Sequence, residues 1–387
     1  MGKLTHIIIL AICFTCCSNT RPKYKKIDTF SYIDEYVVDS ILIDSTETLS
    51  NSMRLYSSCS QCSKERLITI NQNLNLLFCF NLKTQKREWV KKLEDVGIIS
   101  KHGLVNEIFY HKEDSIFIKQ EYAISIIDSN GIKFFISINS EDQKVKEKRI
   151  YNNNGYSEIH YEPTNKRIYF SAYSFESGIT EKEFYDYSIE SYYDMNSKQI
   201  INIPITYHKL YFKRFYGNLI QVTRAFNKDK ILYGYPITEE IIEYDVNNKT
   251  TTLIESEKSN LDLKNTKPFK VKNANDFELK MRHMIASQSY EKLLYDDNRN
   301  FYYRFYSPHI PLKNDDGSYN SYGDKPNTVI IYDKDFNRVT ELNLKNRKYS
   351  SSNTFVMKRG LAIGKNHYKN NDYDSNTISY DIIKFPN

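Results

Sequence analysis

Short apolar strands, gathered in groups of about four and separated by polar turns, constrain this chain more than any other feature. Many of these strands end in Asp or Asn and are followed by a tight polar turn and another strand. Asp and Asn suit such positions because their side chains hydrogen-bond the turn backbone and because both tolerate left-handed conformations. With only 12 Gly in the chain, we expect Asn to supply much of the left-handed backbone. The strand ends that show the pattern are Phe80-Asn81, Ile127-Asp128, Tyr193-Asp194, Tyr244-Asp245 and Tyr332-Asp333.

The repetition of these groups, with almost no helical periodicity, predicts an all-β repeat fold, and we expect a six-bladed β-propeller. Five fairly complete groups are followed by a last group of only three strands, at 354–358, 361–364 and 377–385. An isolated strand at 36–43 can supply the fourth strand, which would join the two ends of the ring and leave no exposed edge. Seven blades are the main alternative, because the fourth group holds five candidate strands, and a pair of β-sandwiches is the other. Those five candidate strands are 210–215, 219–223, 231–235, 241–245 and 251–254.

The amino-acid composition agrees with a β-rich, aromatic core. The chain contains 33 Tyr and 21 Phe, mostly in short runs with Ile and Val. These residues favour strands, and the aromatic ones bury large areas. The 54 basic and 48 acidic residues are intermixed, give a net charge of +6 and form no basic stripe. The sequence therefore predicts no nucleic-acid partner.

The N-terminus has the pattern of an export signal that ends in a lipid anchor. Lys3 and His6 precede an apolar run at 7–14, which is far shorter than the roughly 18 residues that span a bilayer. The cysteines that follow resemble the bacterial lipobox, in which the cysteine after the cleavage site is acylated. Cys17 fits this role because a small residue precedes it and polar residues follow, and Cys16 is the alternative. Two or three acyl chains would anchor the protein stably in a membrane.

These features divide the chain into three parts. We expect a lipoprotein signal peptide at 1–16, a polar tether at 17–32 and the β-propeller at 33–387. A soluble secreted protein with an ordinary signal peptide is the alternative.

Long loops on a rigid scaffold are where binding residues concentrate. In a propeller, the loops from the second to the third strand of a blade share one face with the connections between blades. The long connections at 139–156, 173–184, 255–288, 307–327 and 365–376 all fall on that face. Their Tyr, His and acidic side chains suit a protein, peptide or glycan ligand, and solvated loops without a ligand are the alternative. The expected ligand-binding residues are Tyr306, His309, Asp315, Asp316, Tyr319, Tyr322, His367, Tyr368 and Tyr373.

Motifs for catalysis and for metal or cofactor binding are sparse. We expect Cys59 and Cys62 to form a local disulfide in an oxidising compartment, with free thiols as the alternative. Cys79 lies in an apolar strand and is expected to be a core residue. The eight His residues show no metal-ligand spacing, and no nucleophile elbow, phosphate loop or dinucleotide fingerprint occurs. The sequence therefore predicts no catalytic residue, no metal and no cofactor.

The signal with Cys16-Cys17, the length, the Tyr-, Asn- and Lys-rich strands and the Tyr-Asp turns resemble a family of Bacteroidota lipoproteins. Members of that family have no known function and are expected to form six-bladed propellers of the TolB-like or NHL-like kind. The resemblance implies a lipid-anchored location in the cell envelope. The segment 18–23 lacks the acidic residues of the surface-export signal of that phylum, which favours the outer membrane with the propeller facing the periplasm.

Two functions follow from these observations. The first is a non-enzymatic binding or scaffold lipoprotein of the envelope that uses its long-loop face. The alternative is a glycan-active hydrolase or lyase whose site groups lie on that same face.

Overall fold

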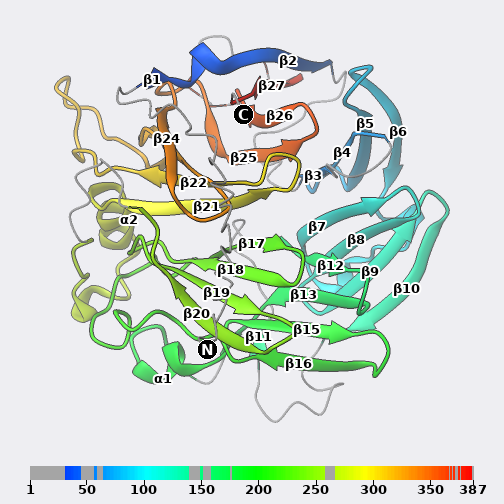
Figure 1. The fold of residues 1–387 in the computed structure, drawn as a ribbon, viewed down its shortest axis with the longest axis horizontal. Helices are drawn as coiled ribbons and strands as arrows, with labels where there is room; N and C mark the ends of the chain where they lie inside the picture. The colour runs from blue at the N-terminus through cyan, green and yellow to red at the C-terminus, as the bar shows by residue number, and fades with distance from the viewer. Residues whose placement is uncertain are drawn as a thin grey trace, which may run out of the picture.

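The computed structural model describes residues 31–44, 56–58, 64–138, 149–150, 158–174, 177–257, 266–365, 367, 369–370, 374 and 376–385. These residues form six antiparallel sheets that follow one another in chain order around a central axis (Figure 1). The predicted six-bladed β-propeller is confirmed, and the seven-bladed ring and the pair of sandwiches are excluded.

Each blade has four antiparallel strands. Blade one contains β3 (Tyr56–Ser58), β4 (Arg66–Asn71), β5 (Leu76–Asn81) and β6 (Lys86–Lys92). Blade two contains β7 (Val105–Lys112), β8 (Ser115–Gln120), β9 (Ala123–Asp128) and β10 (Gly131–Ser137). Blade three contains β12 (His160–Glu162), β13 (Arg167–Ser171), β15 (Glu190–Asp194) and β16 (Gln199–Ile203).

The second half of the ring repeats the arrangement. Blade four contains β17 (Thr223–Asn227), β18 (Lys230–Gly234), β19 (Ile241–Asp245) and β20 (Thr250–Ile254). Blade five contains β21 (Ser289–Asp296), β22 (Phe301–Ser307), β23 (Thr328–Tyr332) and β24 (Arg338–Asn343). Blade six contains β25 (Ser350–Met357), β26 (Gly360–Gly364), β27 (Thr377–Ile383) and β2 (Val37–Asp44). The first strand of a blade lies innermost, so that β17 contacts β21, β21 contacts β25, and β25 contacts β3.

The remaining elements are short and lie between strands. A two-stranded ribbon pairs β11 (Arg149–Ile150) with β14 (Tyr173–Ser174). The helices are α1 (Lys182–Asp186) and α2 (Phe277–Ala286), with single 3-10 turns at η1 (Ile33–Tyr36), η2 (Glu94–Val96), η3 (Ser100–His102), η4 (Val271–Asn273) and η5 (Tyr322–Asp324).

The first described segment joins blades five and six. Its strand β1 (Ser31–Tyr32) pairs in parallel with β24, and β2 then pairs antiparallel with β27 as the outermost strand of blade six. Between these strands, Ile33 is fully buried in the core shared by the two blades. On the other side, the Leu42 amide donates to Gln85 Oε1 at 3.0 Å, so that β2 also touches blade one.

The predicted strands 210–215 and 219–223 are wrong, because residues 204–222 cross from blade three to blade four without pairing and β17 begins only at Thr223. Its apolar side chains are buried in an aromatic cluster instead. The ring centroids of Tyr211 and Tyr216 lie 5.5 Å apart, and the Tyr211 hydroxyl donates a hydrogen bond to the carbonyl of Leu219. Burial therefore produced a strand-like pattern without a strand.

The predicted role of Asp and Asn at strand ends is confirmed. Asp194 Oδ1 accepts hydrogen bonds from the amides of Asn196 and Ser197, and Asp245 Oδ1 does the same for Asn247 and Asn248. The residue type that adopts the left-handed backbone conformation differs from the expected Asn. Among the described non-glycine residues with positive φ, Lys occurs four times, at Lys166, Lys198, Lys228 and Lys249, whereas Asn occurs at Asn75 and Asn300.

Replacing Lys249 by glycine should therefore stabilise the protein by about 0.5 kcal/mol. Its φ of 55° is strained for an L-residue by about 1–2 kcal/mol, and the greater freedom of glycine in the unfolded chain offsets part of the gain. Urea denaturation would measure the change. Lys249→Ala is the control, because alanine keeps the strain, and equal stability of the two variants would contradict the explanation.

Candidate functional site

A cavity of about 960 Å³ lies inside the ring, between the innermost strands of blades two to six. It extends toward the end of the ring that carries the short turns, because Lys228, Asp229, Asp297 and Asn300 of these turns line it. Cavities of roughly 300–1,000 Å³ are typical of small-molecule sites. This end is opposite to the long-loop face.

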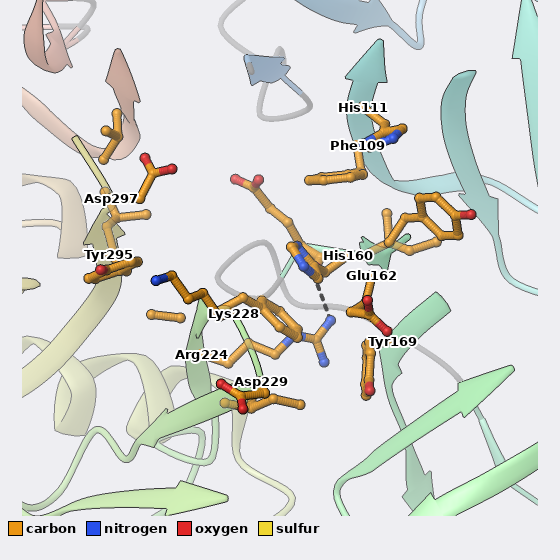
Figure 2. A pocket seen from close by; sticks show the side chains of 18 of the residues that line it. Phe109, His111, His160, Glu162, Tyr169, Arg224, Lys228, Asp229, Tyr295 and Asp297 are labelled. Carbon is orange, nitrogen blue, oxygen red and sulfur yellow. Dashed lines mark hydrogen bonds between the residues drawn. The ribbon is translucent and has the colours of Figure 1, made fainter. Parts of the chain in front are cut away.

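Three aromatic rings from successive blades form one wall of the cavity (Figure 2). The ring of His160 in β12 stacks on that of Phe226 in β17, with centroids 3.7 Å apart and planes 10° from parallel. The ring centroid of Phe109 in β7 lies 5.1 Å from that of His160. Such a wall offers extended aromatic surface to a ligand.

The two histidines that line the cavity, His160 and His111, are neutral near pH 7. Burial, and then the charges of Arg224 and His111, lower the pKa of His160 to about 3. Burial also lowers the pKa of His111, whose ring lies 5.1 Å from that of Tyr161. Both imidazoles therefore act as aromatic and hydrogen-bonding groups without charge.

A buried ionic network forms the floor. The guanidinium of Arg224 in β17 donates to the carboxylate of Glu190, to Ser171 Oγ at 3.2 Å and to the Glu158 carbonyl at 2.7 Å. Glu107 continues the network, with Oε2 at 4.0 Å from Arg224 and Oε1 at 2.8 Å from Nζ of Lys119. Burial raises the pKa of Glu190 to about 7, although Arg224 opposes this effect.

A second pair completes the floor toward blades five and six. Lys292 Nζ in β21 lies 3.5 Å from Glu158 Oε1 and donates to the Thr354 carbonyl at 2.7 Å. The side chain of Glu158 is 42% exposed, whereas those of Lys292 and Arg224 are 4% and 2% exposed. The charge that the floor presents to the cavity is therefore the carboxylate of Glu158.

The alternation of a β-strand explains how these layers arise, because residues two apart point to the same side. Along the channel, a charged residue is followed two positions later by a ring. The pairs are Glu107 and Phe109, Glu158 and His160, and Arg224 and Phe226. In blades five and six, Lys292 precedes Leu294, and Thr354 precedes Val356. This charged-x-aromatic pattern is the sequence signal of the cavity, and the predicted ligand-binding residues do not include it.

The residues predicted to bind a ligand lie elsewhere, and none of the described ones lines the cavity. Some of them hold the long loops in place: Tyr306 donates to Gln288 Oε1 at 3.0 Å, Tyr322 donates to Glu291 Oε1 at 3.0 Å, and His367 Nε2 lies 2.6 Å from the Gly323 carbonyl oxygen. The others are exposed, namely His309, Asp315, Asp316 and Tyr319. Tyr368 and Tyr373 lie outside the described residues.

The cysteine predictions have different outcomes. Cys79 is fully buried in β5, as expected, and burial raises the pKa of its thiol to about 12. Cys16, Cys17, Cys59 and Cys62 lie outside the described residues, so the lipidation site and the disulfide stay predictions. In the described ranges, no group of three or more His, Cys, Asp or Glu side chains is placed to hold a metal ion, and no helix is long and apolar enough to cross a membrane.

Asp324 ties together three loops of the long-loop face. Its carboxylate lies 2.6 Å from Lys369 Nζ and 3.4 Å from Arg347 Nε, and it accepts a hydrogen bond from Ser321 Oγ at 2.7 Å. Burial alone would raise the pKa of Asp324, but the bonds from Lys369 and Ser321 outweigh it and lower this pKa to about 2.

A stability profile at low pH would test this arrangement. Because the folded pKa of Asp324 is lowered, its contribution is present above the unfolded pKa and is lost as the pH falls from about 4 to 2. Allowing for solvent screening, we expect a loss of about 1–2 kcal/mol in the wild type that Asp324→Asn does not show. Urea denaturation between pH 2 and 5 would measure it. Parallel profiles for the two proteins would contradict the assignment.

The fold and its central cavity place the chain among six-bladed β-propellers that have a ligand-sized central cavity. Residues 152–343 match the model of DUF4221, a domain of unknown function. The matched region spans blades three to five, which supply Glu158, His160, Arg224, Phe226 and Lys292. A solved DUF4221 member from Bacteroides vulgatus is 19% identical, with a TM-score of 0.72, over 90% of this chain and 97% of that chain. The expected resemblance to a propeller family of unknown function is thus confirmed, since the chain is similar to DUF4221 in sequence over 152–343 and in fold over most of its length.

Two other solved structures share only a general likeness. A luciferin-regenerating enzyme is 10% identical over 89% of this chain and 96% of that chain, with a TM-score of 0.44. The β-propeller domain of Cps50 (Swd1) from Myceliophteria thermophila is 9% identical over 86% of this chain and 83% of that chain, with a TM-score of 0.43. No curated protein matches the chain.

Proposed function

We propose that this chain is a binding protein of the cell envelope, anchored by lipid at Cys17, that holds a small polar ligand in its central cavity. The observation that carries the proposal is the composition of that cavity: an aromatic wall above a fixed ionic floor, in a volume of about 960 Å³. Charged groups that already have partners cost little reorganisation when a ligand arrives, which favours binding. The cavity replaces the long-loop face as the preferred site.

Binding would be tested by thermal unfolding in the presence of monosaccharides, disaccharides, amino acids and dipeptides. Val356 lines the cavity, so Val356→Trp should fill part of it and abolish stabilisation by a ligand. Tyr319→Ala is the matched control, because Tyr319 is 62% exposed on the long-loop face. Loss of binding in Tyr319→Ala and not in Val356→Trp would move the site to the long-loop face.

The location in the envelope rests on the N-terminal sequence. Cys17 follows a short apolar run and a small residue, an arrangement that resembles the bacterial lipobox. Cells grown with a labelled fatty acid should incorporate label into the wild type and into Cys16→Ser but not into Cys17→Ser. Label retained in Cys17→Ser and lost in Cys16→Ser would move the anchor by one residue. We place the anchor in the outer membrane with the propeller on the periplasmic side.

A glycan-active hydrolase or lyase is the second candidate, and Glu158 is the observation that favours it. Burial raises the pKa of this partly exposed carboxyl, although Lys292 and Arg224 oppose the shift, and a raised pKa is what a general acid needs. Most glycosidases place a second carboxyl across the bond that breaks, but Glu190 is covered and paired with Arg224. Release of new reducing ends from glycans by the wild type, and its loss in Glu158→Gln, would establish the enzyme.

A further inference from the structure

Among the described residues that line the cavity, carboxylates exceed cations. Four carboxylates, those of Glu158, Glu162, Asp229 and Asp297, line it with the three cations of Arg224, Lys228 and Lys292. Behind the floor, two further carboxylates accompany one cation, Lys119. The cavity is thus negative in a chain whose net charge is +6. An excess of one sign of charge in a hollow favours ligands of the other sign.

At the floor, the exposure of the charged groups strengthens the asymmetry, whereas Lys228 and Asp229 of opposite charge are both exposed near the turns. The carboxylate of Glu158 is the accessible charge of the floor, while the cations beside it are covered and fixed by carbonyl oxygens: Lys292 donates to Thr354, and Arg224 donates to Glu158 itself. A ligand that reaches the floor therefore meets a negatively charged carboxylate, which attracts positively charged groups. Lys292 at 3.5 Å from Oε1 reduces this attraction without covering the carboxylate.

The wall beside Glu158 is suited to the same ligand. Glu158 lies two residues before His160, the first residue of β12, and the stack of His160 with Phe226 places aromatic surface in the same cavity as the carboxylate. Aromatic faces attract ammonium groups by about 0.5–2 kcal/mol, and most strongly where water is excluded. His160 and His111 are uncharged near pH 7 and do not repel a cation.

From this geometry we infer that the ligand of the central cavity carries an ammonium group, which is held by Glu158 against the rings of His160, Phe226 and Phe109. The inference rests on the proposed function and specifies its ligand class. Part of the binding is electrostatic, so affinity should fall with ionic strength.

Matched probes separate charge from shape. Choline and 3,3-dimethylbutan-1-ol differ in the positive charge but have nearly the same shape, and glucosamine and glucose form a second pair on a sugar scaffold. Isothermal titration of the full mature chain should show at least tenfold tighter binding of the amine in one pair or both. Equal affinity for amine and neutral compound in both pairs would overturn the inference. The proposed function would then still stand if any neutral compound binds and Val356→Trp abolishes that binding.

Variants localise the effect. Glu158→Gln should weaken amine binding at least tenfold. The affinity for the neutral compound of the same pair should change by no more than about twofold. Asp316→Asn is the control, because it makes the same change of charge at an exposed residue of the long-loop face. If Glu158→Gln does not fold, as judged by its thermal transition, Phe226→Leu tests the aromatic wall instead. This variant should weaken binding of the amine about three- to tenfold. Full amine affinity in a folded Glu158→Gln, or in Phe226→Leu where that variant is used, would overturn the inference.

Discussion

Replacing Ile41 by alanine is expected to lower the free energy of unfolding by about 3–4 kcal/mol. Ile41 lies in β2 and is fully buried in a cluster that includes Leu67 of blade one and Tyr380 of blade six. The substitution removes contacts with both blades and leaves a cavity between them. Urea denaturation, followed by the fluorescence of the single Trp89, would measure the loss.

The next residue of the same strand provides the control. Leu42 points to the opposite side of the sheet and is 57% exposed, so Leu42→Ala should change the stability by no more than about 0.5 kcal/mol. Equal losses in the two variants would show that β2 does not pack against the blades in this register.

The second large effect is expected at the ionic floor. Glu190→Gln removes the closest counter-charge of Arg224, which cannot lose its proton and would stay buried with Glu107 at 4.0 Å. Removing one partner of a buried ion pair typically costs 3–5 kcal/mol, and we expect about that loss of unfolding free energy here. Chemical denaturation at about pH 8, above the pKa of Glu190, would measure it, because most of Glu190 is then ionised in the wild type.

A double variant identifies the cause of this loss. In Glu190→Gln combined with Arg224→Met, no unpaired guanidinium is left in the core, so most of the lost stability should return. Arg224→Met alone should cost less than Glu190→Gln, because Glu190, whose pKa is already about 7, can take up a proton. Losses that simply add in the double variant would show that the two side chains act independently.

Much of the fold could be predicted from local sequence signals. Strand ends such as Tyr244-Asp245 carry a turn residue whose hydrogen bonds are local, so the sequence alone identifies them. The helix α2 was missed, although Asp276 caps it by accepting a hydrogen bond from the Leu279 amide, because an Asp before a short amphipathic run also suits a loop. The strand β3 was missed because it is only three residues long, in a polar stretch.

The candidate site was harder to predict, because its parts are distant in the sequence. Glu158 and Lys292 come from blades three and five and meet only after the ring has formed. The abundance of Tyr and Asp in the long loops favoured a binding site there instead. In the structure, Tyr306 and Tyr322 form hydrogen bonds that hold those loops. A search for a charged residue followed two positions later by a ring, at the start of each blade, would have found Glu107, Glu158 and Arg224.

The pairing of β2 with β27 has a consequence for the order of events during synthesis. Val37–Asp44 is synthesised before blade one and Thr377–Ile383 after blade five, yet Asp44 pairs with Thr377. The early strand β2 therefore cannot pair with β27 until the propeller domain has been translated through blade six. Contacts between segments this distant along the chain slow folding. A nascent chain that stops short of β27 exposes one apolar strand edge at each end of the unfinished ring, which makes the incomplete product a natural target for chaperones and proteases.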